Sequence, residues 1–186
     1  IHFEKVLATA RRNRSVVPAY LMTSPVTHDE QIAYLAEHKN FGVPAEDVVP
    51  FCQGTMPAVD AETGKLLLAE KDSLFLSPDG HGGMVSALSA SGAIADMRRR
   101  GIEHLFYLQV DNPLAPICDA EFIGHHLLAE SDFSSMACAK QTPQDRLGNF
   151  ALIDGRLQVI EYSDLPEDVA EKRDAAGGLV FWAGSV

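Results

Sequence analysis

The sequence predicts an α/β protein in which a mixed, mainly parallel sheet is flanked by helices and extended by an antiparallel hairpin layer. Short apolar runs, typical of buried strands, alternate with helical patterns through the earlier part of the chain. Paired strand patterns joined by compact turns follow in the later part. With 186 residues, 46% of them hydrophobic and 22% charged, the chain is long enough for a hydrophobic core, and we expect one domain core.

The first elements follow from periodicity and capping. Apolar side chains share one face of a predicted helix over residues 1–14. Residues 16–22 (VVPAYLM) predict a buried strand. Thr27, with Glu30 three positions later, predicts a capped helix over residues 28–38.

Alternating and turn-rich segments come next. Residues 48–51 predict a second strand, and residues 56–68 predict a hairpin with its turn at 62–64. The glycine-rich loop 77–83 (SPDGHGG) then precedes a pair of predicted helices. The remaining predicted elements are helices over 84–91, 93–100 and 119–130 and strands over 104–110, 134–140, 150–153 and 157–162, with Asp154 and Gly155 as a hairpin turn.

Charge and composition exclude several classes of protein. The sequence has 15 Lys and Arg residues and 26 Asp and Glu residues, which gives a net charge of -11. This charge disfavours nucleic acid as a partner. No apolar run approaches the ~18 residues of a membrane span, so we expect no membrane partner. The three cysteines are an odd number at wide spacing, which predicts small core residues in a reducing, cytoplasmic protein.

The two ends of the sequence predict a piece of a longer protein. The first helical pattern starts without a capping residue. The last residues, FWAGSV, stop within an apolar run.

Candidate ligand-binding residues follow predicted strands, where open α/β sheets bind ligands. The glycines of loop 77–83 would allow close approach to a flat or anionic ligand, although a tight turn is the alternative. Asp111 and Asn112 would suit a nucleotide with a hard cation, or would only cap a turn. Glu161 could accept hydrogen bonds from sugar hydroxyls, or stand at a solvated strand end. The Gln53 amide offers the donor and acceptor that a uracil or adenine edge requires, or stabilises a turn.

Together, these segments form a pattern that none of them establishes alone. They are MTSPVT (22–27), FG (41–42), PFCQGTMPAV (50–59), SPDGHGGMVSAL (77–88), RRGIEHLFYLQVDNPL (99–114), DAEFIGHHL (119–127) and LQVIEYSDL (157–165). The ordered set resembles the UDP-N-acetylglucosamine pyrophosphorylase family, uridylyltransferases that join UTP to a sugar 1-phosphate.

The resemblance implies a Rossmann-like fold of the nucleotide-diphospho-sugar transferase type and assigns roles to residues. Asp111 would be the catalytic residue that faces the phosphates and binds Mg²⁺, the implied cofactor. Gly148 and Glu161 would contact the sugar. The implied nucleotide-binding residues are Gln53, Pro78, Asp79, Gly80, His81, Gly82 and Asn112, with Gln53 and Gly80 meeting the uracil.

The implied function is synthesis of UDP-N-acetylglucosamine and pyrophosphate from UTP and N-acetylglucosamine 1-phosphate. A UDP-glucose or broad UDP-sugar pyrophosphorylase is the alternative, because His81 stands where the N-acetylglucosamine enzymes usually have Asn. Asp164 replaces the last acid of the usual EYSE. The family's glycine-rich triphosphate loop would precede Ile1 and a phosphate-binding Lys would follow Val186, so the chain resembles the central portion of the catalytic domain. A non-catalytic nucleotide-sugar-binding module is the third alternative.

Overall fold

The structure, a computed structural model, describes residues 1–184. The last two residues of the FWAGSV end lie outside the described residues. The chain divides into two compact units, residues 1–122 and residues 123–186.

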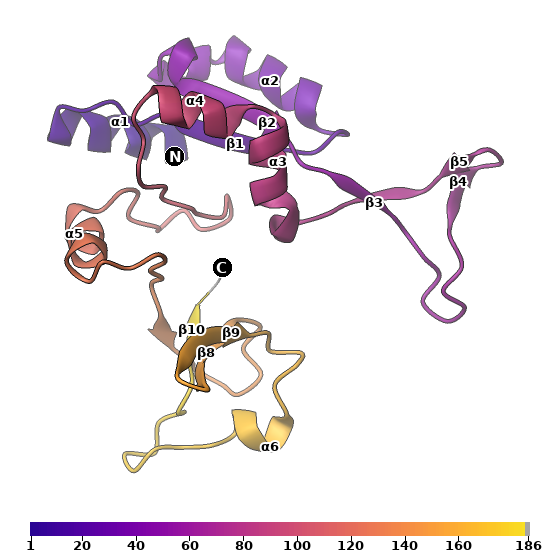
Figure 1. Cartoon of the computed structure of the whole chain (residues 1–186), viewed down its shortest axis with the longest axis vertical. Coiled ribbons are helices and arrows are strands. Elements are labelled where there is room, and N and C mark those ends of the chain that lie inside the picture. Colours follow the sequence, from indigo (N-terminus) through magenta and orange to yellow (C-terminus); the bar gives the residue numbers. More distant parts are fainter. Residues whose placement is uncertain (185–186) are drawn as a thin grey trace. The chain divides into compact units, whose positions relative to one another are not determined.

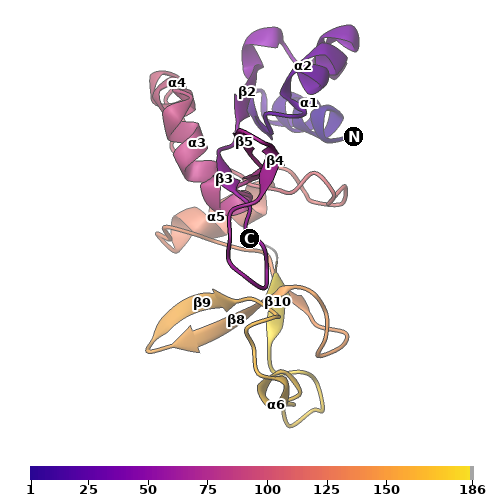
Figure 2. The ribbon, with the colours of Figure 1, turned by 90° about the vertical axis from the view of Figure 1, so that its right-hand side faces the viewer.

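The first unit is built on a parallel pair of strands, β1 (Ala19–Thr23) and β2 (Val48–Cys52), aligned with Ala19 opposite Val48. Phe51 of β2 packs into a core of buried apolar side chains from the two helices that follow the glycine-rich loop. These helices are α3 (Met84–Ala90) and α4 (Ala93–Arg99). Figures 1 and 2 show α3 and α4 on one side of the strand pair, and α1 (His2–Asn13) and α2 (His28–Glu37) on the other.

The four helices of this unit confirm the predicted ones to within a residue or two at each end. The predicted cap of α2 is wrong in detail, because the Thr27 side chain makes no capping hydrogen bond. Its hydroxyl lies 2.9 Å from the Ser24 hydroxyl and accepts a hydrogen bond from the Gln31 amide (3.2 Å). Short 3-10 turns at Lys39–Gly42, Ala45–Asp47 and His81–Gly83 complete the helical elements.

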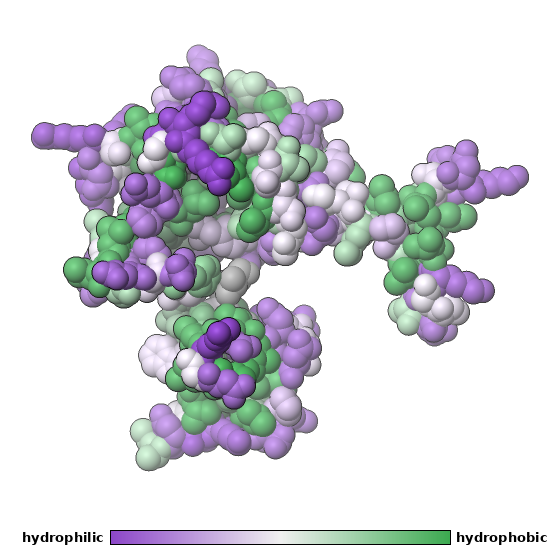
Figure 3. Space-filling model, viewed as in Figure 1, coloured by the Kyte–Doolittle hydropathy of each residue, from purple (hydrophilic) through white to green (hydrophobic). Residues whose placement is uncertain are grey.

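Residues 55–78 form an antiparallel arm rather than the shorter hairpin predicted over 56–68. Its base pairs β3 (Thr55–Pro57) with β6 (Leu76–Pro78), and its far end pairs β4 (Leu68–Glu70) with β5 (Ser73–Leu74). The predicted turn at 62–64 is confirmed. Figure 1 shows the arm leaving the rest of this unit, and Figure 3 shows hydrophobic residues exposed along it. Leu68, Phe75 and Leu76 are among the exposed hydrophobic residues of the arm.

The strand predicted over 104–110 is wrong. Residues 102–109 have no regular secondary structure, and a turn begins at Val110. A strand needs a neighbour for its backbone groups, and the parallel sheet of the described first unit consists of β1 and β2. Apolar character alone therefore predicted a strand that does not form among the described residues.

The second unit is an antiparallel sheet in the order β7-β10-β8-β9. The hairpin of β8 (Gly148–Ile153) and β9 (Arg156–Ile160) confirms two predicted strands. The strand predicted over residues 134–140 is shorter in the structure, where it is β7 (Cys138–Ala139). Cys138 is exposed rather than in the core. The remaining elements of this part of the chain are α5 (Ala120–Leu128), which begins in the first unit, α6 (Glu167–Ala170) and β10 (Trp182–Gly184).

The chain is thus α/β, but the predicted mainly parallel sheet requires correction. Among residues 1–184, β1 and β2 are the one parallel pair, and the other pairings are antiparallel. No helix of the described residues has the length and apolar character needed to cross a membrane.

A polar network joins α4 to β1 beside the core. The Tyr20 hydroxyl donates a hydrogen bond to Asp96 (2.7 Å), and Arg100 forms ion pairs with Asp96 (2.9 Å) and Asp47 (2.8 Å). Burial and the Asp96 hydrogen bond raise the pKa of Tyr20 to about 12. The network therefore helps to seat α4 against the strand pair.

We expect Tyr20→Phe to lower the free energy of unfolding by ~1–3 kcal/mol, because a hydrogen bond to a carboxylate is lost. A tyrosine whose folded pKa is raised above its usual ~10 stabilises the fold below that pH. This contribution fades as the pH rises from ~10 to about 12. Denaturant titrations between pH 7 and 11 should thus show a steeper alkaline loss for the wild type than for Tyr20→Phe. The exposed Tyr34→Phe is the control, and equal pH slopes for wild type and Tyr20→Phe would contradict the assignment.

Candidate functional site

Gln53 stands at the carboxyl end of the parallel pair. It follows β2 directly, and its backbone NH donates to the carbonyl of Thr23, the last residue of β1 (2.8 Å). The Gln53 side chain is half-buried and makes no hydrogen bond within residues 1–184. Its amide is therefore available to a ligand, and it does not serve the turn-stabilising role.

The glycine-rich loop lies beside Gln53 because β3 and β6 pair at the base of the arm. Thr55 pairs with Pro78, and the Asp79 backbone NH donates to the carbonyl of Gly54 (3.1 Å). Gly80 adopts φ +69°, a left-handed conformation that favours glycine, and Gly82 is exposed just beyond it. The structure thus brings Gln53 together with the predicted nucleotide-binding loop.

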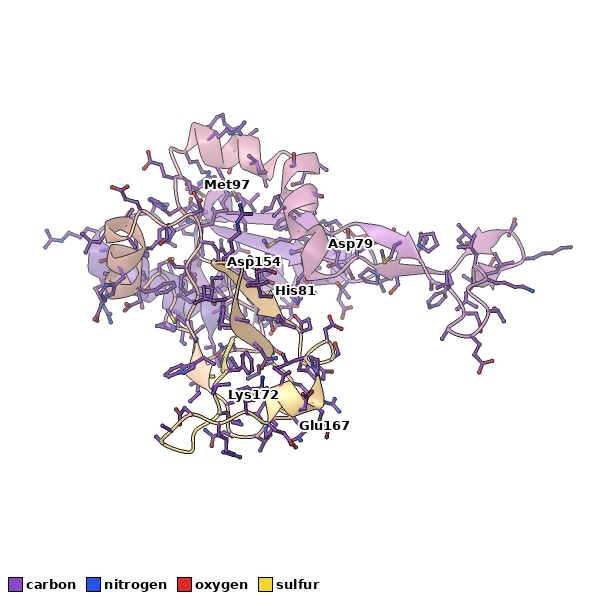
Figure 4. The ribbon with its side chains drawn as sticks, turned by 60° about the horizontal axis from the view of Figure 1, so that its bottom comes forward. Asp79, His81, Met97, Asp154, Glu167 and Lys172 are labelled. Carbon is purple, nitrogen blue, oxygen red and sulfur yellow. The ribbon has the colours of Figure 1, made fainter. Side chains whose placement is uncertain are left out.

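Asp79 is held between two glycines. A Cβ on either Gly54 or Gly83 would overlap the Asp79 carboxylate, and the Oδ1 atom of this carboxylate is buried without a hydrogen-bond partner among the described residues. Figure 4 shows Asp79 and His81 on the segment that leads into α3. The sequence pattern did not single out Gly54 or Gly83 for this role, although glycines flanking a turn are the only signal available.

The resemblance implies that this loop meets a uracil, and on that premise we expect Gly83→Ala to weaken binding of a uridine nucleotide ~10-fold, because an added methyl displaces Asp79 and overpacking typically costs ~1–3 kcal/mol. Calorimetric titration of the whole polypeptide with UTP measures this loss. Gly124→Ala in α5 is the control, because a Cβ there meets nothing within 4 Å. Unchanged affinity in Gly83→Ala would show that Asp79 can move without disturbing the loop.

His81 contacts a residue that the sequence did not mark as functional. Its Nδ1 atom lies within hydrogen-bond distance of the Tyr107 hydroxyl, and the two rings meet edge to face with centroids 6.1 Å apart. Burial raises the pKa of Tyr107. The contact ties the segment that leads to Asp111 to the glycine-rich loop.

Asp111 lies in a turn fixed by the first helix rather than at a strand end. The Val110 carbonyl lies 2.8 Å from the His2 ring, and Lys5 donates to the carbonyls of Pro113 and Ala115. Of the two polar residues in the turn, Asn112 serves as the cap, because its Oδ1 accepts a hydrogen bond from the Leu114 NH (3.3 Å).

The Asp111 side chain is exposed and has no hydrogen-bond or ion-pair partner within the described part of the chain. Its carboxylate is thus free for a ligand. Groups of three or more His, Cys, Asp or Glu able to hold a metal are absent from residues 1–184, so a cation here would need oxygens from a bound phosphate. One carboxylate with phosphate oxygens is the set that Mg²⁺ accepts.

The two predicted sugar-binding residues lie together in the second unit. Gly148 opens β8 and Glu161 follows β9, and a Cβ on Gly148 would lie 3.9 Å from the Glu161 carboxylate. The Glu161 carbonyl accepts hydrogen bonds from the NH groups of Asp164 (3.0 Å) and Leu165 (3.2 Å), which turns the chain and leaves the Glu161 side chain exposed. A carboxylate so placed can accept hydrogen bonds from hydroxyl groups.

Comparison with known proteins gives one family. Residues 1–186 match the family described as UTP--glucose-1-phosphate uridylyltransferase. The chain is 37% identical over 170 residues to UDP-N-acetylhexosamine pyrophosphorylase-like protein 1 of Mus musculus, covering 91% of this chain and 33% of that protein. It is 35% identical over 170 residues to the UDP-N-acetylglucosamine pyrophosphorylase of Saccharomyces cerevisiae, covering 91% and 36%.

A solved structure agrees with these relatives. The fold matches that of the uridine diphosphate N-acetylglucosamine pyrophosphorylase from Trypanosoma brucei, determined in complex with an inhibitor, with a TM-score of 0.85 and 26% identity. The match covers 100% of this chain and 39% of that one. The chain therefore spans about a third of the length of the curated relatives it matches.

Proposed function

Because the chain belongs to the UTP--glucose-1-phosphate uridylyltransferase family, we propose that the whole protein transfers the uridylyl group of UTP to N-acetylglucosamine 1-phosphate. The products would be UDP-N-acetylglucosamine and pyrophosphate. One observation carries the proposal: strand pairing places the unengaged Gln53 amide beside the loop of Asp79 and Gly80, as recognition of a uracil edge requires. The names of the relatives support the sugar.

The reaction would be an in-line attack by an oxygen of the sugar 1-phosphate on the α-phosphorus of UTP. A new phosphorus–oxygen bond forms as the bond to pyrophosphate breaks, so no residue of the protein needs to act as a nucleophile. Catalysis of such transfers depends on positioning and on neutralising charge. Gln53 and the glycine-rich loop would hold the base, and Gly148 and Glu161 would hold the sugar.

Asp111 would hold the Mg²⁺ ion that we propose as cofactor. When bound, the ion would neutralise charge on the phosphates. The exposed, unpaired carboxylate of Asp111 fits this role, because its charge is not already satisfied by another residue among those described. Asn112, as the cap of the same turn, would hold Asp111 in place.

The preferred sugar separates the proposal from its alternative. The family description names glucose 1-phosphate, and His81 stands where the N-acetylglucosamine enzymes usually carry Asn. Steady-state assays of the whole protein with UTP and either N-acetylglucosamine 1-phosphate or glucose 1-phosphate distinguish them. We expect the higher kcat/KM with the N-acetylated sugar, and the opposite order would assign the protein as a UDP-glucose or broad UDP-sugar pyrophosphorylase.

We expect residues 1–186 alone to release no pyrophosphate from UTP. They correspond to about a third of the curated relatives, and the predicted triphosphate loop and phosphate-binding Lys are not among them. A coupled pyrophosphate assay of the purified segment tests this, with the whole polypeptide as the positive control. Substantial release by the segment would place the catalytic groups within it. A whole protein that binds UDP-sugars without turnover would be a nucleotide-sugar-binding module.

Fold and location complete the proposal. In the whole polypeptide, β1 and β2 would belong to a Rossmann-like sheet of the nucleotide-diphospho-sugar transferase type, which the likeness to solved pyrophosphorylases supports. A cytoplasmic location is supported by the three free cysteines.

A further inference from the structure

A lysine is buried in the second unit beside the proposed sugar-binding residues. Lys140 is 8% exposed, and its Nζ donates hydrogen bonds to Asn149 Oδ1 (2.8 Å) and to the Pro143 carbonyl (2.9 Å). No carboxylate of residues 1–184 lies within ion-pairing distance of this ammonium group. A buried cation bound by neutral oxygens is uncommon, because burial disfavours the charge.

The acceptor of this hydrogen bond is itself buried. Asn149 is 0% exposed and is the second residue of β8. Its Nδ2 donates to the carbonyls of Leu147 (3.3 Å) and Ile160 (3.2 Å). Lys140 fixes which way this amide faces, because an ammonium group can bond only to the amide oxygen and so leaves the NH₂ for the two carbonyls.

The two carbonyls precede the two proposed sugar-binding residues. Leu147 comes directly before Gly148, and Ile160 comes directly before Glu161. One amide therefore holds the backbone directly before each of the two proposed sugar contacts, at the open end of the β8–β9 hairpin.

We propose that Lys140 and Asn149 are positioning residues that set the spacing between Gly148 and Glu161 for the sugar of the substrate. The inference rests on the proposed function, because it assigns a role toward that same site. Neither residue would touch the sugar, since both are buried. An apolar pair could fill the same core volume, so the polar pair is explained by the backbone geometry that it imposes.

The first test is Lys140→Met in the whole polypeptide, which keeps the length of the side chain and removes the ammonium group. We expect the KM for the sugar 1-phosphate to rise ~10-fold to ~10²-fold, the size of effect that slight misplacement of a contact can produce. The KM for UTP should stay unchanged, because the proposed base contacts belong to the first unit. A purely structural role would lower the active fraction, and hence the apparent kcat, with both KM values unchanged, and that result would overturn the proposal.

A second variant tests whether Lys140 acts through Asn149. Asn149→Val alone should raise the same KM, and adding Lys140→Met to it should have little further effect. If the KM increases of the two single variants multiply in the double variant, the two residues act independently and the coupling is overturned. Lys172→Met is the matched control, because Lys172 is an exposed lysine of the same unit (Figure 4).

Hydrogen exchange separates failure of this inference from failure of the proposed function. In Lys140→Met, peptides covering residues 147–149 and 160–162 should exchange faster, while peptides of β1 and β2 should be unaffected. If the wild-type protein turns over no sugar 1-phosphate, the proposed function fails, and exchange still decides the inference. Unchanged exchange in both peptides would overturn it.

Discussion

Asp111→Asn in the whole polypeptide should lower turnover with UTP and sugar 1-phosphate by ~10²-fold to ~10³-fold, as removal of a single preorganised stabilising group does elsewhere. The substitution keeps the size of the side chain and removes the charge that a hard cation prefers. Affinity for UDP-N-acetylglucosamine without metal should change little, because Gln53 and Gly80 are untouched. Steady-state kinetics at saturating Mg²⁺ measure the turnover, and calorimetry without metal measures the affinity for UDP-N-acetylglucosamine.

The unfolding temperature of Asp111→Asn shows whether a loss of turnover comes from a loss of stability. The Asp111 carboxylate is exposed and makes no hydrogen bond within residues 1–184, so Asp111→Asn should unfold at the wild-type temperature. Asp72→Asn, in the exposed arm, is the charge-matched comparison and should retain wild-type turnover. Near-normal turnover in Asp111→Asn would remove this residue from the mechanism, and a lowered unfolding temperature would give it a structural role instead.

Gly148→Ala should destabilise the second unit and distort the proposed sugar site. A Cβ at this position would lie 2.5 Å from Val159 Cγ1 and 3.0 Å from the Gly184 carbonyl oxygen. The oxygen belongs to the backbone of β10 and cannot turn aside as a side chain can. Overpacking of this kind destabilises by ~1–3 kcal/mol, and we expect a loss of that size.

The functional effect of Gly148→Ala should fall on one substrate. We expect the KM for the sugar 1-phosphate to rise at least ~10-fold, since even a small displacement of substrate contacts is costly. The KM for UTP should remain within about twofold of wild type, a change of ~0.4 kcal/mol. Gly124→Ala is again the comparison for adding one methyl group. Wild-type stability with an unchanged sugar KM would show that β8 and β10 separate without cost.

Local elements were predictable, and pairing between segments distant in the sequence was not. Helices such as α2 and α4 follow from apolar periodicity within one stretch of sequence. The hairpin turn at Asp154 and Gly155 is also local, and both residues have the positive φ angles, 51° and 77°, that such two-residue turns require. Residues 104–110 have an equally strong apolar pattern but remain without a strand, because a strand depends on a distant neighbour.

The candidate site was likewise predictable only in part. Gln53 and the glycine-rich loop were expected together from the rule that ligands bind beyond the carboxyl ends of strands, and the structure places them side by side. The close packing of Asp79 against Gly54 and Gly83 and the Lys140–Asn149 hydrogen bond were not predictable, because they depend on which side chains the fold buries. A lysine at the end of an exposed strand gives no such signal.

The arm over residues 55–78 behaves as an insertion between Gln53 and Asp79. Its base alone, where Thr55 pairs with Pro78, joins these two residues, and its far end lies away from them. The entropy of closing a loop grows only slowly, by ~0.6 kcal/mol for each doubling of length. Relatives could therefore vary the length and composition of the arm widely while the proposed nucleotide-binding loop keeps its place. The tip of the arm is where a tag or the new termini of a circular permutant would be tolerated.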